Sequence, residues 1–174
     1  MSEHLEVVAF DPGGTTGFAW YAREAGQGHA DAHIAYGEIP NGRSSAYDFI
    51  NDIITSEGSP VIGINGDVWH YHPRVVCEDF IINTATATKS RQSDPLRIAG
   101  YLEGKCAEYG HPFKLQTPAQ AKAFATDDKL RHLGWYHSTP GGHANDAARH
   151  LLTYLCIETK DPEILALLAE LLED

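Results

Sequence analysis

Apolar residues recur along the chain at two different spacings, and the spacing separates predicted strands from predicted helices. Short runs rich in valine, isoleucine and aromatic residues, bounded by glycine, proline or asparagine, favour strands. Apolar residues three and four positions apart favour amphipathic helices. The predicted strands span residues 5–10, 16–21, 33–39, 75–82 and 112–116, and the predicted helices span residues 44–54, 94–109, 118–124, 127–133 and 143–156, with a last helix from 161.

The order of these segments predicts one α/β domain at residues 1–160. Three consecutive strands followed by helix, strand, helix and strand suit a mixed five-stranded sheet, with three antiparallel strands, then parallel strands, and helices on its faces. Residues 57–73 favour no element, and the polar residues 83–93 predict a loop. Residues 161–174 are predicted as an acidic helix whose apolar stripe either packs on its own sheet or joins a second copy. The stripe consists of Ile164, Leu165, Leu167, Leu168, Leu171 and Leu172.

Three acidic residues stand where predicted elements end or begin. Asp11 follows the first strand, Glu78 interrupts the apolar fourth strand, and Asp146 lies in the first turn of a helix, three residues after His143. Carboxylates at an apolar edge are rare unless paired, and three together repel one another unless cations neutralise them. The positions therefore indicate a divalent-metal site. Each also has a structural explanation: a hydrogen-bonded turn for Asp11, an edge strand facing water for Glu78, and the helix dipole for Asp146.

The glycines after Asp11 do not form a nucleotide-binding loop. The chain has neither GxxxxGK[ST] nor a GxGxxG that opens a helix, so we expect no nucleotide cofactor. Asp11 to Thr15 fits the Asp-x-Gly-x-Thr phosphate motif of the actin and sugar-kinase fold, but that fold needs two such domains and 174 residues supply one. We expect the glycines to let a phosphate backbone approach Asp11 closely.

The net charge of −11 argues against a nucleic-acid partner until its distribution is considered. Residues 1–73 hold two basic and ten acidic residues, whereas residues 74–149 hold ten basic and eight acidic ones. Residues 161–174 carry five acids and no base. A local basic face is therefore compatible with the acidic total, and so is an ordinary solvated surface.

The chain shows no signal for a membrane or for secretion. It lacks an apolar run of about 18 residues and a basic start followed by an apolar stretch, so we expect no membrane association. Cys77, Cys106 and Cys156 are odd in number and lack CxxC spacing. They predict reduced core thiols in a cytoplasmic protein.

Four short motifs occur in order between residues 6 and 156. They are Asp-Pro-Gly-x-x-x-Gly from Asp11, Glu78 in the fourth strand, Thr-Pro-Ala-Gln-Ala-Lys at 117–122, and His-Ala-Asn-Asp-Ala-Ala-Arg-His-Leu-Leu at 143–152. This ordered set resembles the RuvC family of Holliday junction resolvases, in the form found in bacteriophages. The resemblance implies an RNase H-like fold and a homodimer that cuts branched DNA with Mg²⁺ or Mn²⁺ in the host-cell cytoplasm.

The resemblance also assigns roles by motif position. It implies that Asp11, Glu78 and Asp146 are acidic metal ligands and that His143 fills the fourth ligand position of the family. With two ions, Asp11 would bridge, Glu78 and Asp146 would each hold one, and His143 would orient or deprotonate the attacking water. The expected products carry a 5′-phosphate and a 3′-hydroxyl.

Basic side chains and one aromatic ring are the expected DNA contacts. Lys122 matches a catalytic lysine of the family and Lys129 a second one, and both would neutralise charge that develops on the phosphate. Phe80 is the candidate for the aromatic wedge of the bacterial members, although we expect it on the same strand face as Glu78. The expected DNA contacts are Lys89, Arg91, Lys122, Lys129, Arg131 and Phe80.

The predicted function is a metal-dependent, structure-selective DNA endonuclease. Its expected substrates are Holliday junctions and, as further branched DNA, forks and flaps. One alternative is an RNase H-like nuclease of RNA or RNA–DNA hybrids. Another is a non-catalytic DNA-binding protein whose acidic residues are structural.

Overall fold

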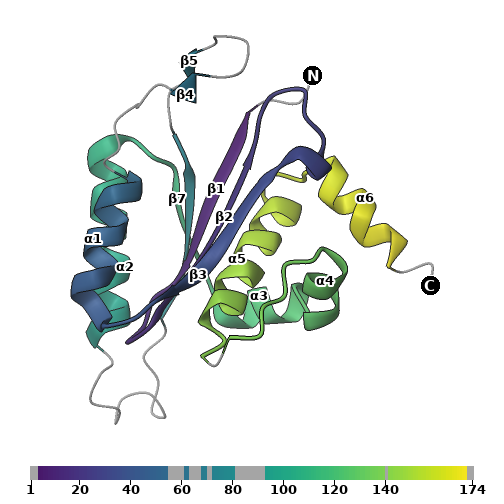
Figure 1. Cartoon of the computed structure of the whole chain (residues 1–174). Coiled ribbons are helices and arrows are strands. Elements are labelled where there is room, and N and C mark those ends of the chain that lie inside the picture. The colour runs from purple at the N-terminus through teal and green to yellow at the C-terminus, as the bar shows by residue number, and fades with distance from the viewer. Residues whose placement is uncertain are drawn as a thin grey trace.

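Five strands form the central sheet of the protein, whose computed structural model describes residues 4–54, 61–62, 68–69, 72–80, 93–139 and 141–171. They are β1 (Leu5–Asp11), β2 (Thr16–Arg23), β3 (His33–Ile39), β6 (Arg74–Glu78) and β7 (Phe113–Gln116). The strand order is β3-β2-β1-β6-β7. β1, β2 and β3 pair antiparallel, whereas β6 runs parallel to β1 and β7 parallel to β6 (Figure 1). The mixed five-stranded sheet, three antiparallel strands followed by parallel ones, is confirmed.

Helices cover both faces of this sheet. α1 (Gly42–Ile54) and α2 (Ser93–Tyr109) lie side by side on one face, and α5 (His143–Ile157) crosses the other (Figure 1). Because successive residues of a strand point to opposite faces, Val8 and Phe10 of β1 pack with α1 and α2, while Val7 and Ala9 pack with α5. The remaining helices, on the side of α5, are α3 (Pro118–Phe124), α4 (Asp127–His132) and α6 (Pro162–Glu170).

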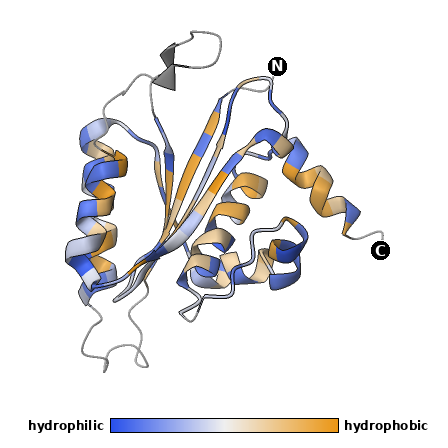
Figure 2. Ribbon diagram, in the orientation of Figure 1, coloured by the Kyte–Doolittle hydropathy of each residue, from blue (hydrophilic) through white to orange (hydrophobic). Residues whose placement is uncertain are grey.

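Central β1 is buried along its whole length, which the hydropathy colouring reflects: β1 and α5 carry strongly apolar residues on the inside of the molecule (Figure 2). At an estimated 25 cal/mol per Å² of apolar surface, burial on two faces makes this strand a major contributor to the stability of the fold. The last residue of β1 is nevertheless a carboxylate, Asp11, and its side chain is buried as well. The strand thus presents a charge at the edge of the core.

The predicted element order is confirmed, and the differences lie mainly at element ends. The fourth predicted strand, 75–82, ends at Glu78 instead, because its neighbour β7 ends at Gln116, where Thr117 caps α3. Phe80 therefore lies beyond the strand, and the expected shared strand face with Glu78 is wrong. The predicted loop 83–93 lies outside the described residues except for Ser93, which begins α2. Sequence patterns missed β4 (Val61–Ile62), β5 (Val68–Trp69) and the 3₁₀ turn His29–Asp31.

The C-terminal helix α6 packs on its own chain. Ile164 and Leu168 are buried in the cluster that α5 forms with the sheet, whereas Leu165 is exposed. Asp161 caps the helix and forms a buried ion pair with Arg23 of β2 at 2.6 Å. Removing one partner of such a pair typically costs about 3–5 kcal/mol, so the pair fixes the start of α6 to the sheet. The boundary at residue 160 stays a prediction.

The three cysteines are free and buried. Burial raises the thiol pKa of Cys106 to about 12 and that of Cys156 to about 11, so both thiols stay protonated and behave as core side chains. Among the helices described, none is long and apolar enough to cross a membrane.

Candidate active site

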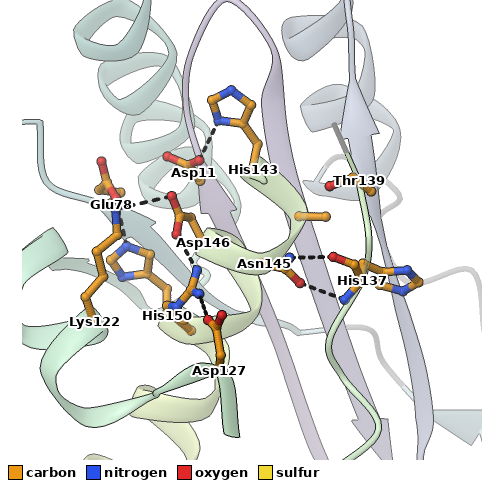
Figure 3. A network of polar contacts seen from close by, with 12 residues as sticks. Asp11, Glu78, Lys122, Asp127, His137, Thr139, His143, Asn145, Asp146 and His150 are labelled. Carbon is orange, nitrogen blue, oxygen red and sulfur yellow. Dashed lines mark hydrogen bonds and ion pairs between the residues drawn. The ribbon is translucent and has the colours of Figure 1, made fainter. Parts of the chain in front are cut away.

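Two parallel strands end side by side at one edge of the sheet, and each ends in a carboxylate. β1 ends at Asp11 and β6 at Glu78, one position beyond the paired Phe10 and Cys77. α5 begins over the same edge with His143, and Asp146 follows one turn later (Figure 3). The fold thus brings together the four residues predicted as ligands from three separate parts of the sequence.

Asp11 and His143 form a hydrogen bond at the centre of this edge. The Nδ1–H of His143 donates to Oδ2 of Asp11 at 2.8 Å. Burial raises the pKa of Asp11, the His143 hydrogen bond opposes that rise, and the charges of Glu78 and Asp146 add to it. The same hydrogen bond is the main cause of the raised pKa of His143. With its side chain 35% exposed, His143 can meet water, whereas Asp11 lies beneath it.

Asp146 is paired with two cationic side chains. Its Oδ1 accepts from Arg149 at 2.5 Å, and its Oδ2 lies 3.3 Å from the ammonium nitrogen of Lys122 on α3. Arg149 also donates to Asp127, at the start of α4. The side chain of Lys122 is 56% exposed, and it lies beside one of the predicted ligands. Its predicted contact with a substrate phosphate stays a prediction. Arg149 and Asp127 were not predicted as part of the site. A signal existed for Arg149, because its i, i+3 spacing from Asp146 places these two residues on one face of α5.

Glu78 is paired with a buried histidine that sequence reasoning missed. Nε2 of His150 lies 3.2 Å from Oε2 of Glu78, and Nδ1 lies 3.1 Å from the side-chain oxygen of Gln116 on β7. Both His150 and Gln116 are almost completely buried. One signal was available: His150 lies four residues after Asp146, so the two share a face of α5.

The donor set suits a hard divalent cation, since Mg²⁺ and Mn²⁺ prefer carboxylate oxygens. The electrostatic coupling of Asp11 to Glu78 and Asp146 fits a shared site, because each charge raises the cost of ionising Asp11. Among the residues that the structure describes, no three His, Cys, Asp or Glu side chains close around one point as a formed metal site would. Each carboxylate is turned instead toward a basic side chain of the protein: His143, His150, or Arg149 with Lys122.

Glu38 of β3 caps the helix that carries His143. Its Oε1 accepts hydrogen bonds from the backbone N–H of His143 at 3.0 Å, that of Ala144 at 3.5 Å and the hydroxyl of Thr139 at 2.8 Å. The position before the helix is Gly142, which supplies no side-chain cap. A carboxylate from a distant strand therefore satisfies the first turn of α5 and benefits from the helix dipole. The sequence carries no local signal for this contact.

We expect Glu38→Ala to destabilise the protein by about 1–2 kcal/mol at pH 7, as loss of a helix cap does, and Glu38→Gln to cost less because an acceptor oxygen remains. The hydrogen bond from Thr139 is the main cause of the lowered pKa of Glu38. A carboxylate whose pKa is lower in the folded than in the unfolded protein stabilises the fold at pH values above its ordinary pKa of 4.5. This contribution disappears as the pH falls through the folded-state pKa. Urea unfolding of wild type and Glu38→Gln should therefore converge in acid, whereas Glu38→Ala, which has no acceptor at any pH, should remain the less stable variant.

Glu103→Gln, on an exposed position of α2, is the matched control and should not change stability at either pH. Equal unfolding midpoints for wild type and Glu38→Ala at pH 7 would show that the cap contributes nothing.

Gly17 lets the start of α5 approach β2. It pairs with Asp11 across the β1–β2 ladder, and a Cβ added there would lie 2.0 Å from the carbonyl oxygen of His143. In contrast, a Cβ added at Gly14 would meet nothing within 4 Å. The close approach that requires Gly17 is thus made by the protein's own helix, which the sequence did not indicate.

The remaining predicted DNA contacts lie at different places. Lys129 donates to the carbonyl of Phe124 at 2.7 Å and lies over that ring, so among the described residues it does not contact the three carboxylates. Arg131 pairs with Asp127 and Asp128 and lies over the ring of Tyr136. Phe80 is partly exposed two residues beyond β6. Lys89 and Arg91 lie outside the described residues.

Comparisons of the sequence with protein-family profiles and with curated proteins find no match. The structure, however, is similar to that of T. thermophilus RuvC in complex with a Holliday junction substrate, with a TM-score of 0.56 over 90% of this chain and 98% of that one, at 16% identity. It is also similar to a Thermus thermophilus RuvC structure, with a TM-score of 0.51 over 86% of this chain and 93% of that one, at 18% identity. At these identities the likeness establishes the RuvC-like, RNase H-like fold.

Proposed function

We propose that the protein is a metal-dependent endonuclease of the bacteriophage RuvC type that cleaves branched DNA, Holliday junctions in particular. The observation that carries this proposal is the meeting of Asp11 and Glu78, at the ends of adjacent parallel strands, with His143 and Asp146 at the start of α5. The similar fold of a RuvC bound to a Holliday junction supports the choice of substrate. The protein would act as a homodimer in the cytoplasm of the host cell.

Asp11, Glu78, Asp146 and His143 would hold one or two Mg²⁺ or Mn²⁺ ions, with Asp11 as the shared ligand. When bound, the metal would supply Lewis-acid activation of water and would stabilise charge on the phosphate. To bind it, the carboxylates must exchange some of their present partners for the metal. Lys122 is the most exposed partner of Asp146 and can move from this carboxylate to the substrate phosphate.

His143 is the proposed proton acceptor. Its Nδ1 donates to Asp11, which leaves Nε2 as the one ring atom that can either bind the metal or, when His143 is not a ligand, take a proton from the attacking water. The water oxygen forms a bond to phosphorus, the bond from phosphorus to the 3′ oxygen breaks, and that oxygen is protonated. The products would carry a 5′-phosphate and a 3′-hydroxyl.

DNA would reach this edge of the sheet past basic side chains from several elements. Lys122 lies beside Asp146, and Arg131 is linked to the same carboxylate through Asp127 and Arg149. Lys129 and Phe80 would contact DNA farther from the cleaved bond. Lys89 and Arg91 complete the set that we propose from sequence.

Cleavage of an end-labelled substrate panel tests the function. With Mn²⁺ or Mg²⁺, we expect a Holliday junction to be nicked in preference to fork, flap, linear duplex and RNA–DNA hybrid, with no product in EDTA. End analysis should give 5′-phosphates. Preferential cleavage of the hybrid would favour an RNase H activity, and binding without cleavage of any substrate would favour a DNA-binding protein.

A further inference from the structure

His150 is a buried polar residue that the proposed chemistry does not use. Its side chain is 1% exposed, and each ring nitrogen has one partner: Oε2 of Glu78 at 3.2 Å for Nε2, and the side-chain oxygen of Gln116 at 3.1 Å for Nδ1. The three side chains come from α5, β6 and β7, so the ring connects the helix to two strand ends. Burial keeps His150 away from any substrate.

A packing role alone does not explain this group. The neighbouring positions Leu151 and Leu152 on α5 fill the core with apolar side chains, which need no partners. An imidazole and an amide at the same depth lose their contacts with water and are tolerated only when hydrogen-bonded. Here the hydrogen bonds lead to Glu78, which is one of the candidate ligands.

The spacing along α5 assigns different tasks to its two histidines. His143 and His150 are seven residues, about two turns, apart on one helix face. His143 contacts Asp11 and is partly exposed, whereas His150 contacts Glu78 and is buried. Water can reach the ring of His143, whereas the ring of His150 is enclosed between Glu78 and Gln116.

We propose that His150 is a positioning residue: supported by Gln116, it fixes one oxygen of Glu78 so that the other, Oε1, is presented to the metal. Among the described residues Oε1 has no hydrogen-bonding partner, which agrees with this division of the carboxylate. This inference rests on the proposed function, because it takes Glu78 as a metal ligand. Partners behind a ligand typically change metal affinity by about 10- to 100-fold.

Three substitutions separate positioning from packing. The side-chain amide nitrogen of glutamine reaches nearly the position of histidine Nε2, whereas that of asparagine reaches the position of Nδ1. His150→Gln therefore keeps the donor to Glu78, His150→Asn keeps only the contact toward Gln116, and His150→Leu removes both. Thr153→Val, which replaces a buried hydroxyl on the same helix that has no partner among the described residues, is the control.

The measurement is the dissociation constant for Mn²⁺, from the EPR signal of the free ion, with the melting temperature of each variant in EDTA. We expect His150→Gln and Thr153→Val to bind Mn²⁺ within about threefold of wild type, and His150→Asn and His150→Leu to bind about 10- to 100-fold more weakly. Equal affinities for the Gln and Asn variants, or affinities that follow melting temperature, would overturn the positioning role. A wild type that binds no Mn²⁺ would instead contradict the proposed function itself.

Discussion

Asp11→Asn is expected to reduce DNA cleavage by about a thousandfold or more while the protein stays folded and still binds DNA. Asparagine has the same shape, and its side-chain oxygen can still accept the hydrogen bond from His143. It lacks the negative charge that a divalent cation requires at the end of β1. Initial rates on a labelled junction in Mn²⁺, with binding measured in Ca²⁺ or EDTA, separate the two effects.

Asp11→Asn should not destabilise the metal-free protein, and the difference in melting temperature between the variant and wild type should depend on pH. Burial raises the pKa of Asp11 in the folded state above its ordinary value of 3.8, even with the opposing His143 hydrogen bond. The folded protein therefore holds this proton more tightly than the unfolded chain, and the group loses its stabilising contribution as the pH rises through the folded pKa. Asparagine does not ionise, so in EDTA its melting temperature at pH 7 should equal or exceed that of wild type, and the difference should shrink in acid.

Asp146→Asn should also abolish cleavage but without any gain in stability, because Asp146 already has Arg149 and Lys122 as counter-charges. Asp48→Asn, on the exposed side of α1, should leave cleavage and stability unchanged.

If Asp11→Asn nicked the junction at the wild-type rate, the site would be assigned to the wrong edge of the sheet. If instead it unfolded in EDTA, Asp11 would be a structural residue.

Sequence patterns predicted the fold because the apolar periods are local properties. The apolar run of β1 and the stripe of α5 each follow from residues within the element, and their order fits few architectures. These patterns could not predict the end of β6. It depends on the neighbouring strand β7, which stops at Gln116 because Thr117 caps α3. Where a neighbouring strand determines the end of a strand, the sequence of that strand alone does not indicate it.

The candidate carboxylates could be predicted because acids at strand ends are visible in a single sequence. Their partners could not, since those contacts join residues far apart: Glu38 to His143, and Glu78 to His150. The sequence showed a cluster of negative charge that required cations. The structure shows that each carboxylate already has a basic partner in the protein, which implies that metal binding competes with these internal contacts.

Gly17→Ala is expected to be the most damaging single-methyl addition near the site. The new Cβ would overlap backbone atoms of His143, the carbonyl oxygen at 2.0 Å and the carbonyl carbon at 2.3 Å, and helix backbone cannot rotate away as a side chain can. We expect a loss of about 3 kcal/mol in the free energy of unfolding, at the upper end of typical overpacking costs. For a chain of this size the melting temperature should fall by about 6–12 °C.

The effect on cleavage should exceed the effect on folding, because Gly17 lies opposite Asp11 in the ladder and beneath the residue that hydrogen-bonds to Asp11. To relieve the overlap, the start of α5 must move away from the sheet, so His143 and Asp146 would shift together relative to Asp11. A displacement of about 1 Å can cost a hundredfold in rate, and we expect that loss at a temperature where the variant is fully folded. Gly14→Ala, three residues earlier in open space, should keep the wild-type melting temperature. Equal melting temperatures for both variants would mean that α5 does not approach β2 this closely. The placement of His143 and Asp146 relative to Asp11 would then be wrong.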